Sequence, residues 1–199
     1  DLLASLRPFV YRKYLDFGAF ESIRTMRTLI ERELNKKSLT GNVKLGRGGI
    51  REIEFIVQSH QLIYGGRNPT LRTSSLYDAL AALEDNGVLT DHDCAMMRRH
   101  YDFLRVLEHR LQIMDDAQTH TVPVEPLART RIALAMGYPE INAFDAAVES
   151  VNDAVHQLFL AVFHQDRGPT ASKNDSLFAD LWENTLAEED QLTHLRALG

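Results

Sequence analysis

The sequence contains little of what stabilises small secreted, metal-binding or membrane proteins. Its 199 residues include one cysteine, Cys94, one tryptophan and six prolines. A single cysteine cannot form an internal disulfide, which excludes a disulfide-stabilised fold and fits a reducing compartment, so we expect a cytoplasmic protein. No apolar run approaches the roughly 20 residues that a transmembrane helix needs, and no membrane segment is predicted.

Basic residues are outnumbered as well. The chain has 22 lysines and arginines against 28 aspartates and glutamates, a formal charge of −6. This balance argues against binding along a nucleic-acid backbone. Because the sequence begins with Asp1 rather than methionine and opens within an apolar phrase, we expect a segment of a longer polypeptide, with part of the working site outside it.

Common catalytic and metal-binding motifs are missing too. There is no Cys-x-x-Cys, no His-Glu-x-x-His and no Gly-x-Ser-x-Gly. His156 and His164 lie on one predicted helix without a carboxylate at ligand spacing, and the adjacent Glu108 and His109 would point in different directions. The sequence therefore predicts no metal site in this chain.

What the sequence does contain is helical periodicity, since apolar residues recur at spacings of three and four. The pattern predicts an all-α bundle of about six to eight helices with a short extended segment at the N-terminus. Ser75 with Asp78, and Thr90 with Asp93, resemble capping boxes. Helices are expected over 16–36, from Ile50 to the glycines at 65–66, from Ser75 to Asn86, for about 25 residues after Thr90, over 128–136, over 141–165, and in a hairpin over 176–199.

Two segments do not follow this period. Residues 7–15 mix aromatic, β-branched and basic side chains, which predicts a short strand or extended lead-in. Residues 167–175 are rich in small and polar residues, which is typical of a linker.

The chain is organised around a glycine turn that leads into an apolar helix. Gly46, Gly48 and Gly49 precede the run that starts at Ile50. We expect such a turn to leave the first N–H groups of the helix uncovered and favourable for an anion. The turn lacks the Gly-Lys-Ser/Thr ending of a P-loop and the preceding strand of a dinucleotide-binding fingerprint, so on its own it is a weak signal.

Four polar residues of this helix, Arg51, Glu54, Gln58 and Gln61, have spacings that place them on one face. Because apolar residues occupy most of the remaining circumference, this polar stripe is expected to face water, a polar partner or a cleft. The alternative is that Arg51 and Glu54 form an ordinary exposed pair of the i, i+3 type.

Three phrases resemble the bacterial glutamine synthetase adenylyltransferase/adenylyl-removing enzyme family. They are Lys-Leu-Gly-Arg-Gly-Gly-Ile-Arg-Glu-Ile-Glu-Phe over 44–55, Gln-Leu-Ile-Tyr-Gly-Gly-Arg over 61–67 and Gln-Thr-His-Thr-Val-Pro over 118–123. The resemblance covers roughly residues 5–165 and is to the helical domain that follows the first, adenylyl-removing, nucleotidyltransferase domain. It implies that residues 1–15 end that preceding domain and that residues 16–166 form the helical domain.

The resemblance also implies an activity. The family reaction is phosphorolysis of adenylylated glutamine synthetase, which gives ADP, while the other half of the full enzyme attaches AMP from ATP. Glutamine synthetase, the PII signal protein and the adjacent nucleotidyltransferase domain are the implied partners, and Mg²⁺ with ATP or ADP are the implied cofactors of the full enzyme. The residues implied to neutralise phosphate charge or orient catalytic groups are Glu54, Arg51, Lys44, Arg47, Arg12 and Lys13.

Nucleotidyltransferases of this superfamily hold magnesium with an Asp-x-Asp pair after a Gly-Ser turn. Asp91-His92-Asp93 matches that pattern by letters only, because it lies at a predicted helix start without the turn or a strand. The fragment alone is therefore expected to be inactive. Two other interpretations stay open: the similar helical domain of a PII uridylyltransferase, and a helical docking module for PII or glutamine synthetase with no chemical role.

Overall fold

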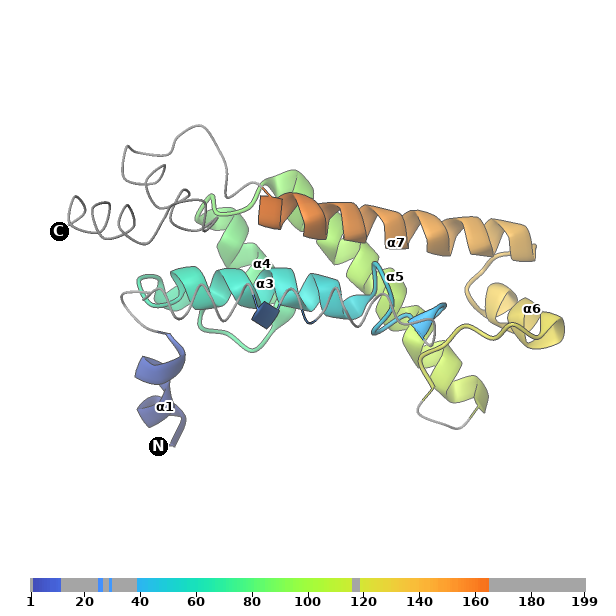
Figure 1. Cartoon of the computed structure of the whole chain (residues 1–199), viewed down its shortest axis with the longest axis horizontal. Helices are drawn as coiled ribbons and strands as arrows, with labels where there is room; N and C mark the ends of the chain where they lie inside the picture. Colours follow the sequence, from blue (N-terminus) through green and yellow to red (C-terminus); the bar gives the residue numbers. More distant parts are fainter. Residues whose placement is uncertain (1, 12–24, 27–28, 30–38, 116–118, 165–199) are drawn as a thin grey trace, which may run out of the picture. The chain divides into compact units, whose positions relative to one another are not determined.

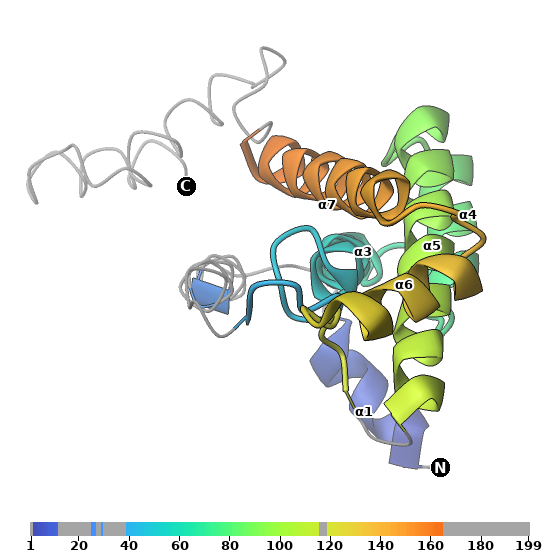
Figure 2. The same cartoon turned by 90° about the vertical axis from the view of Figure 1, so that its right-hand side faces the viewer.

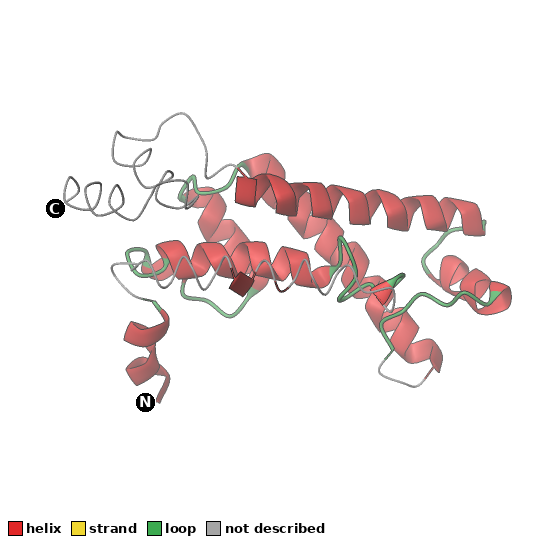
Figure 3. Cartoon of the chain, in the orientation of Figure 1, coloured by secondary structure: helices red, strands yellow, loops and turns green. Residues whose placement is uncertain are grey.

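The structure is a computed structural model, and it describes residues 2–11, 25–26, 29, 39–115 and 119–164. Residues 1–159 form one compact unit, and of the second unit, residues 160–199, only the end of the last helix is described. The described residues contain six α-helices, one short 3₁₀ helix and a single β-bridge, which confirms the all-α prediction (Figures 1 and 3). None of the described helices has the length and apolar character that crossing a membrane requires.

Helix α3 (Ile50–Tyr64) begins at Gly49 and ends at Gly65, as the sequence predicts. It runs parallel to α7 (Ile141–His164), since Glu52 meets His156 and, three residues further along both helices, the Phe55 ring packs 5.9 Å from the Phe159 ring. Figure 2 shows these two helices nearly end-on, beside one another.

Helices α4 (Leu76–Asp85) and α5 (Asp91–Asp115) pack on each other and on α3. Their starts confirm the capping signals: Ser75 Oγ accepts a hydrogen bond from Asp78 N, and Thr90 Oγ1 accepts one from Asp93 N. Asp93 is thereby a capping residue, as its position at a helix start suggested. Between α3 and α4, a 3₁₀ helix η2 (Pro69–Leu71) occupies the predicted loop.

Helix α6 (Pro126–Ala135) begins two residues earlier than predicted. The reason is that Glu125 acts as its N-cap, accepting hydrogen bonds from Leu127 N and Ala128 N, while Pro126 occupies the first helical position, which needs no N–H donor.

The apolar core lies where these helices meet. Cys94 is buried within it, and burial raises the pKa of its thiol to about 11. Large side chains that are fully buried come from four α-helices and from η2: Ile50, Ile53 and Ile56 of α3; Leu71 of η2; Leu80 and Leu83 of α4; Met97, Leu104, Leu107 and Leu111 of α5; and Phe144 and Phe159 of α7.

The extended segment predicted over 7–15 is wrong for the part that the structure describes. Residues Leu2–Val10 form helix α1, with Pro8 inside it, and Tyr11 N still donates to Arg7 O. The leucine- and alanine-rich start is a strong helix former that the aromatic and β-branched residues after it do not override. Of the predicted helix over 16–36, only residues 25, 26 and 29 are described, and they are helical; residues 167–199 lie outside the described part of the chain.

Candidate functional site

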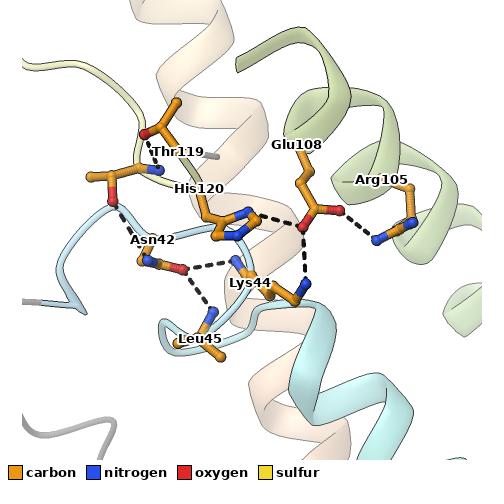
Figure 4. A network of polar contacts seen from close by, with 8 residues as sticks. Asn42, Lys44, Leu45, Arg105, Glu108, Thr119 and His120 are labelled. Carbon is orange, nitrogen blue, oxygen red and sulfur yellow. Dashed lines mark hydrogen bonds and ion pairs between the residues drawn. The ribbon is translucent and has the colours of Figure 1, made fainter. Parts of the chain in front are cut away.

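The turn before α3 is fixed by hydrogen bonds from its own first residue and from a distant segment. Asn42 Oδ1 accepts from the backbone N–H groups of Lys44 and Leu45, at 3.1 and 2.8 Å (Figure 4). An antiparallel bridge joins Asn42 to Thr121, and Val43 N donates to His120 O at 2.7 Å. The predicted glycine turn and the Gln-Thr-His-Thr-Val-Pro phrase are therefore neighbours in space.

The glycines of the turn are required by close packing. Gly48 has a φ of +69°, and a Cβ there would lie 1.9 Å from the backbone oxygen of Asn152 on α7. At Gly46 a Cβ would lie 2.3 Å from the Asn42 carbonyl oxygen. No side chain fits at either position, so the turn can approach α7 and itself this closely only with glycine.

The expectation that the turn leaves helix N–H groups uncovered is wrong. Gly49, Ile50, Arg51 and Glu52 donate their backbone N–H groups to carbonyl oxygens of the turn, at 3.0 to 3.1 Å. A backbone donor that is already paired inside the protein has little to offer an anion. Any anion bound near the turn has to be held by side chains.

A buried carboxylate, Glu108 of α5, lies behind the turn. The residue is 1% exposed, and three basic side chains surround it. Lys44 Nζ lies 3.5 Å and His120 Nδ1 3.0 Å from Glu108 Oε1, while the Arg105 guanidinium donates to Glu108 Oε2 (Figure 4). Glu108 thus ties the turn, the 119–122 segment and α5 together.

A second buried carboxylate, Glu52, fixes the turn on the α7 side. It is completely buried, with the His156 Nδ1 atom 3.1 Å from its Oε1, and it accepts the Gly48 N–H. Burial raises the pKa of Glu52, and the Gly48 N–H and the nearby His156 oppose that rise only in part. Two buried carboxylates therefore clamp the turn, Glu108 towards α5 and Glu52 towards α7.

Sequence reasoning missed both carboxylates as organising residues. Glu52 falls among the apolar residues of α3, and Glu108 lies between Leu104 and Leu111 on the buried face of α5. An acidic residue on the apolar face of an amphipathic helix was the signal that could have identified them, since a buried charge needs a partner. Their distant partners could not be read from spacing, since His156 lies 104 residues from Glu52. Spacing could reveal only the i, i+3 neighbour of Glu108, Arg105.

The predicted site residues are placed differently from one another. Arg47 pairs with Asp153 of α7 at the surface, and Lys44 reaches Glu108. Arg51 is exposed, and within the described part of the chain its side chain makes no ion pair with Glu54 or any other residue. Arg12 and Lys13 lie outside the described residues.

Glu54 is half-buried against α5. Its Oε1 lies 3.5 Å from the Tyr101 hydroxyl. The pKa of Tyr101 is raised first by burial of the hydroxyl and second by the negative charge of Glu54. The Arg105 guanidinium lies over the Tyr101 ring, 6.0 Å from its centroid. Glu54 is thus connected through Tyr101 and Arg105 to the Glu108 cluster.

The predicted polar stripe is only partly a surface. Gln58 is exposed, but Gln61 is 8% exposed and donates to the Leu71 and Thr73 carbonyl oxygens, so it is a structural residue. Among the described residues, no group of three His, Cys, Asp or Glu side chains is arranged to hold a metal ion.

Comparison with known proteins places this arrangement in a family. Residues 24–163 match the family model described as GlnD PII-uridylyltransferase. The chain belongs to this family. Over 191 residues, 96% of the chain, it is 43% identical to a protein named bifunctional glutamine synthetase adenylyltransferase/adenylyl-removing enzyme from Hahella chejuensis, and it spans 20% of that relative.

The two matches cover the same part of the chain. A family domain named for a uridylyltransferase is therefore also present in the adenylyltransferase relative, and membership of the family does not by itself separate the two enzymes. The resemblance stated from the sequence phrases is confirmed by the relative, and the described part of the family domain includes both buried carboxylates.

Proposed function

We propose that the chain is the helical domain of a bacterial glutamine synthetase adenylyltransferase/adenylyl-removing enzyme and that it supports phosphorolytic deadenylylation of glutamine synthetase in the cytoplasm. The observation that carries the proposal is the 43% identity over 96% of the chain with the relative of that name. In this reaction a phosphate oxygen attacks the phosphorus of the tyrosyl-AMP ester. A new P–O bond forms, the bond to the tyrosine oxygen breaks, and ADP and the protonated tyrosine result.

The proposed contribution of this domain is to present polar side chains to the preceding nucleotidyltransferase domain, of which residues 1–15 are the end. Mg²⁺ and the nucleotide belong to the full enzyme, and the described residues offer no magnesium ligand set. Arg51 is the candidate for phosphate charge, because it is exposed and makes no ion pair among the described residues. Glu54 is the candidate for orienting a group of the adjacent domain, with Tyr101 fixing its carboxylate.

The domain boundaries and partners are part of the same proposal. Residues 16–166 are the helical domain, 167–175 a linker, and 176–199 a helical hairpin or the start of the next region. Glutamine synthetase is the substrate protein, and PII is the regulator. Arg47 contributes by holding the turn on α7 through its pair with Asp153, and Lys44, which pairs with Glu108, keeps a partly exposed ammonium group at the turn.

The test measures phosphate-dependent ADP release from adenylylated glutamine synthetase. The 199-residue chain is compared with a protein extended upstream by one nucleotidyltransferase domain. Turnover by the longer protein only is the expected result. Failure of both proteins under conditions where an authentic full-length enzyme turns over would contradict the proposal.

A second candidate, the equivalent domain of a PII uridylyltransferase, is favoured by the description of the matching family. The same upstream-extended protein distinguishes the two. Transfer of UMP from UTP to PII, without ADP release from adenylylated glutamine synthetase, would replace the first proposal by the second.

A further inference from the structure

We infer that Lys44, Arg105 and His120, gathered by the buried carboxylate of Glu108, form a binding site for a phosphate-type oxyanion. Arg105 and His120 are not among the residues that the sequence pattern selects. The inference rests on the proposed function for its setting, and its structural argument comes from the geometry of this cluster.

The first observation is the convergence of basic groups. Lys44 comes from the glycine turn, Arg105 from α5 and His120 from the segment before α6. Lys44 Nζ and His120 Nδ1 both lie within 3.5 Å of the same Glu108 oxygen, and Arg105 binds the other oxygen. Three basic groups that lie within 3.5 Å of one small carboxylate are close enough to one another to contact one tetrahedral oxyanion beside it.

The second observation is an excess of positive charge. Lys44 and Arg105 carry two permanent charges, and Glu108 supplies one negative charge. Among the described residues, no other carboxylate lies within ion-pair distance of either cation. Glu54 contacts the hydroxyl of Tyr101, at 3.5 Å, whereas Arg105 lies over the ring of the same tyrosine. A further anion would therefore be attracted to the cluster.

The exposed fractions of the four side chains indicate that the anion would bind on the solvent side of the cluster. The Glu108 side chain is 2% exposed, whereas those of Lys44, Arg105 and His120 are 39%, 35% and 24% exposed. The carboxylate anchors the cluster from inside, and the basic groups extend to solvent. Arginine offers further N–H donors on its fork, and lysine has three rotatable donors, which suits the several acceptors of a phosphate.

The imidazole also has an unused donor or acceptor. His120 Nδ1 is buried and lies 3.0 Å from Glu108 Oε1, but the two atoms are not aligned for a hydrogen bond. Buried polar atoms without a hydrogen bond are uncommon and call for a physical reason. The His120 Nδ1 atom therefore keeps a hydrogen-bonding capacity that no described residue uses.

The backbone makes this arrangement rigid. His120 O accepts a hydrogen bond from Val43 N. Lys44 N donates to Asn42 Oδ1 (Figure 4), so two of the three basic residues are attached to the same turn. Cations that are already in place lose little conformational freedom when an anion binds, which favours affinity.

The test is calorimetric titration of inorganic phosphate into the 199-residue chain at constant ionic strength maintained with chloride. Lys44→Gln and Arg105→Gln are each expected to raise the dissociation constant at least about tenfold. Arg99→Gln is the matched control, because Arg99 lies exposed on the same helix α5; it should change the constant less than twofold. Circular dichroism establishes that each variant is folded.

A measurement on the unmutated chain does not depend on the folding of any variant. The NMR signals of the His120 ring, assigned with His120→Gln, are expected to shift saturably with phosphate and not with an equal ionic strength of chloride. Absence of saturable binding, equal weakening by Arg99→Gln, or binding that is unchanged in both cluster variants would overturn the inference.

A parallel titration with ADP identifies the source of the anion. Competition by ADP assigns the site to a nucleotide phosphate, and phosphate binding without competition assigns it to the free ion; each supports the site. Because binding is measured on this chain alone, the inference can fail while ADP release by the upstream-extended protein succeeds, and the reverse result is equally distinguishable.

Discussion

The turn before α3 and helix α6 are positioned by different interactions. The turn is fixed by two buried carboxylates, by a glycine that touches the α7 backbone and by a bridge to residue 121. Helix α6 buries only Ile132 and Ala133, and it exposes Leu127 and Leu134 at 58% each. Its cap, Glu125, is also exposed.

This difference shows what each region can tolerate. Helix α6 is positioned by little apolar burial, which is non-directional, and by one partly exposed ion pair, Arg129 with Asp145 of α7. Hydrogen bonds and ion pairs to buried carboxylates fix position and angle. Replacing both members of a buried ion pair together by well-packed apolar residues is often neutral for stability, whereas removing one member alone is costly. We therefore expect the intact pairs of Glu52 and Glu108 to contribute mainly to the geometry of the turn.

The largest effect should come from breaking the close approach at Gly48. Gly48→Ala places a Cβ 1.9 Å from a backbone oxygen in a left-handed conformation, and it should lower the free energy of unfolding by about 3 kcal/mol or more. Gly87→Ala is the matched control: Gly87 has a φ of +63° but nothing within 4 Å of its Cβ position, so the cost should be about 1 kcal/mol. Urea unfolding measures both, and equal costs would mean that backbone strain alone explains Gly48.

The second largest effect should come from removing the carboxylate at the centre of the Glu108 cluster. Glu108→Ala removes the carboxylate that accepts a hydrogen bond from Arg105 and forms ion pairs with Lys44 and His120. We expect a loss of about 2–3 kcal/mol, less than for a fully buried pair because the cations reach solvent. The comparison is Glu84→Ala, which breaks the half-exposed pair of Glu84 with Arg98 and should cost less than about 1 kcal/mol. Unfolding curves that give the same loss for both glutamates would contradict the assigned role of Glu108.

A smaller effect should appear in the pH dependence of stability. Burial raises the pKa of Glu52 above its ordinary 4.5, so between the two values the folded state binds more protons than the unfolded state. The stability that comes from this tighter proton binding is fully present below pH 4.5, and it is lost as the pH rises through the raised pKa of Glu52. Relative to Glu52→Gln, wild-type stability should fall by up to about 1.4 kcal/mol per pH unit in that window.

Glu125 supplies the opposite sign as a control. The N–H groups of Ala128 and Leu127 lower the pKa of its carboxyl, so its contribution is lost as the pH falls. The wild-type protein should lose stability on acidification through Glu125, and Glu125→Gln should not show this loss. The wild-type protein should lose stability as the pH rises through Glu52, and Glu52→Gln should not show that loss. Denaturation series that extend below pH 4.5 for Glu125 and above it for Glu52 would refute the assignment if both variants changed the pH dependence of stability in the same direction.

The smallest effect is expected on the exposed face of α6. Leu134→Ser should change the free energy of unfolding by less than about 0.5 kcal/mol, because this side chain is already largely in water. Ile132→Ala, two residues earlier and 1% exposed, should cost about 2 kcal/mol or more. Thermal unfolding with a larger loss at Leu134 than at Ile132 would mean that α6 is covered on its outer face.

Local signals accounted for much of the fold. Caps at Ser75 and Thr90, the left-handed stop at Gly87 and the period of the long helix depend on residues within a few positions, and each is in place. Helix α1 was not predicted, because the aromatic and β-branched residues after position 7 favour an extended segment and the helix-forming leucines before them were given less weight.

The site could be predicted only in part. The glycine turn was located, but Gly48 is required by Asn152, about a hundred residues away, and the N–H groups of the turn are paired within it. The convergence of Lys44 and His120 on Glu108 likewise depends on packing between distant segments. Spacing within one helix cannot reveal such contacts, although an acidic residue on an apolar face indicates that a partner exists.

The most direct test of the account is the rate of phosphate-dependent ADP release by the upstream-extended protein carrying Glu54→Ala, with Gln58→Ala as the control from the next turn of α3. The account predicts that Glu54→Ala lowers the rate at least about tenfold while unfolding curves stay close to wild type, and that Gln58→Ala leaves the rate unchanged. A Glu54→Ala protein that releases ADP at the wild-type rate would contradict it and return Glu54 to a structural role beside Tyr101.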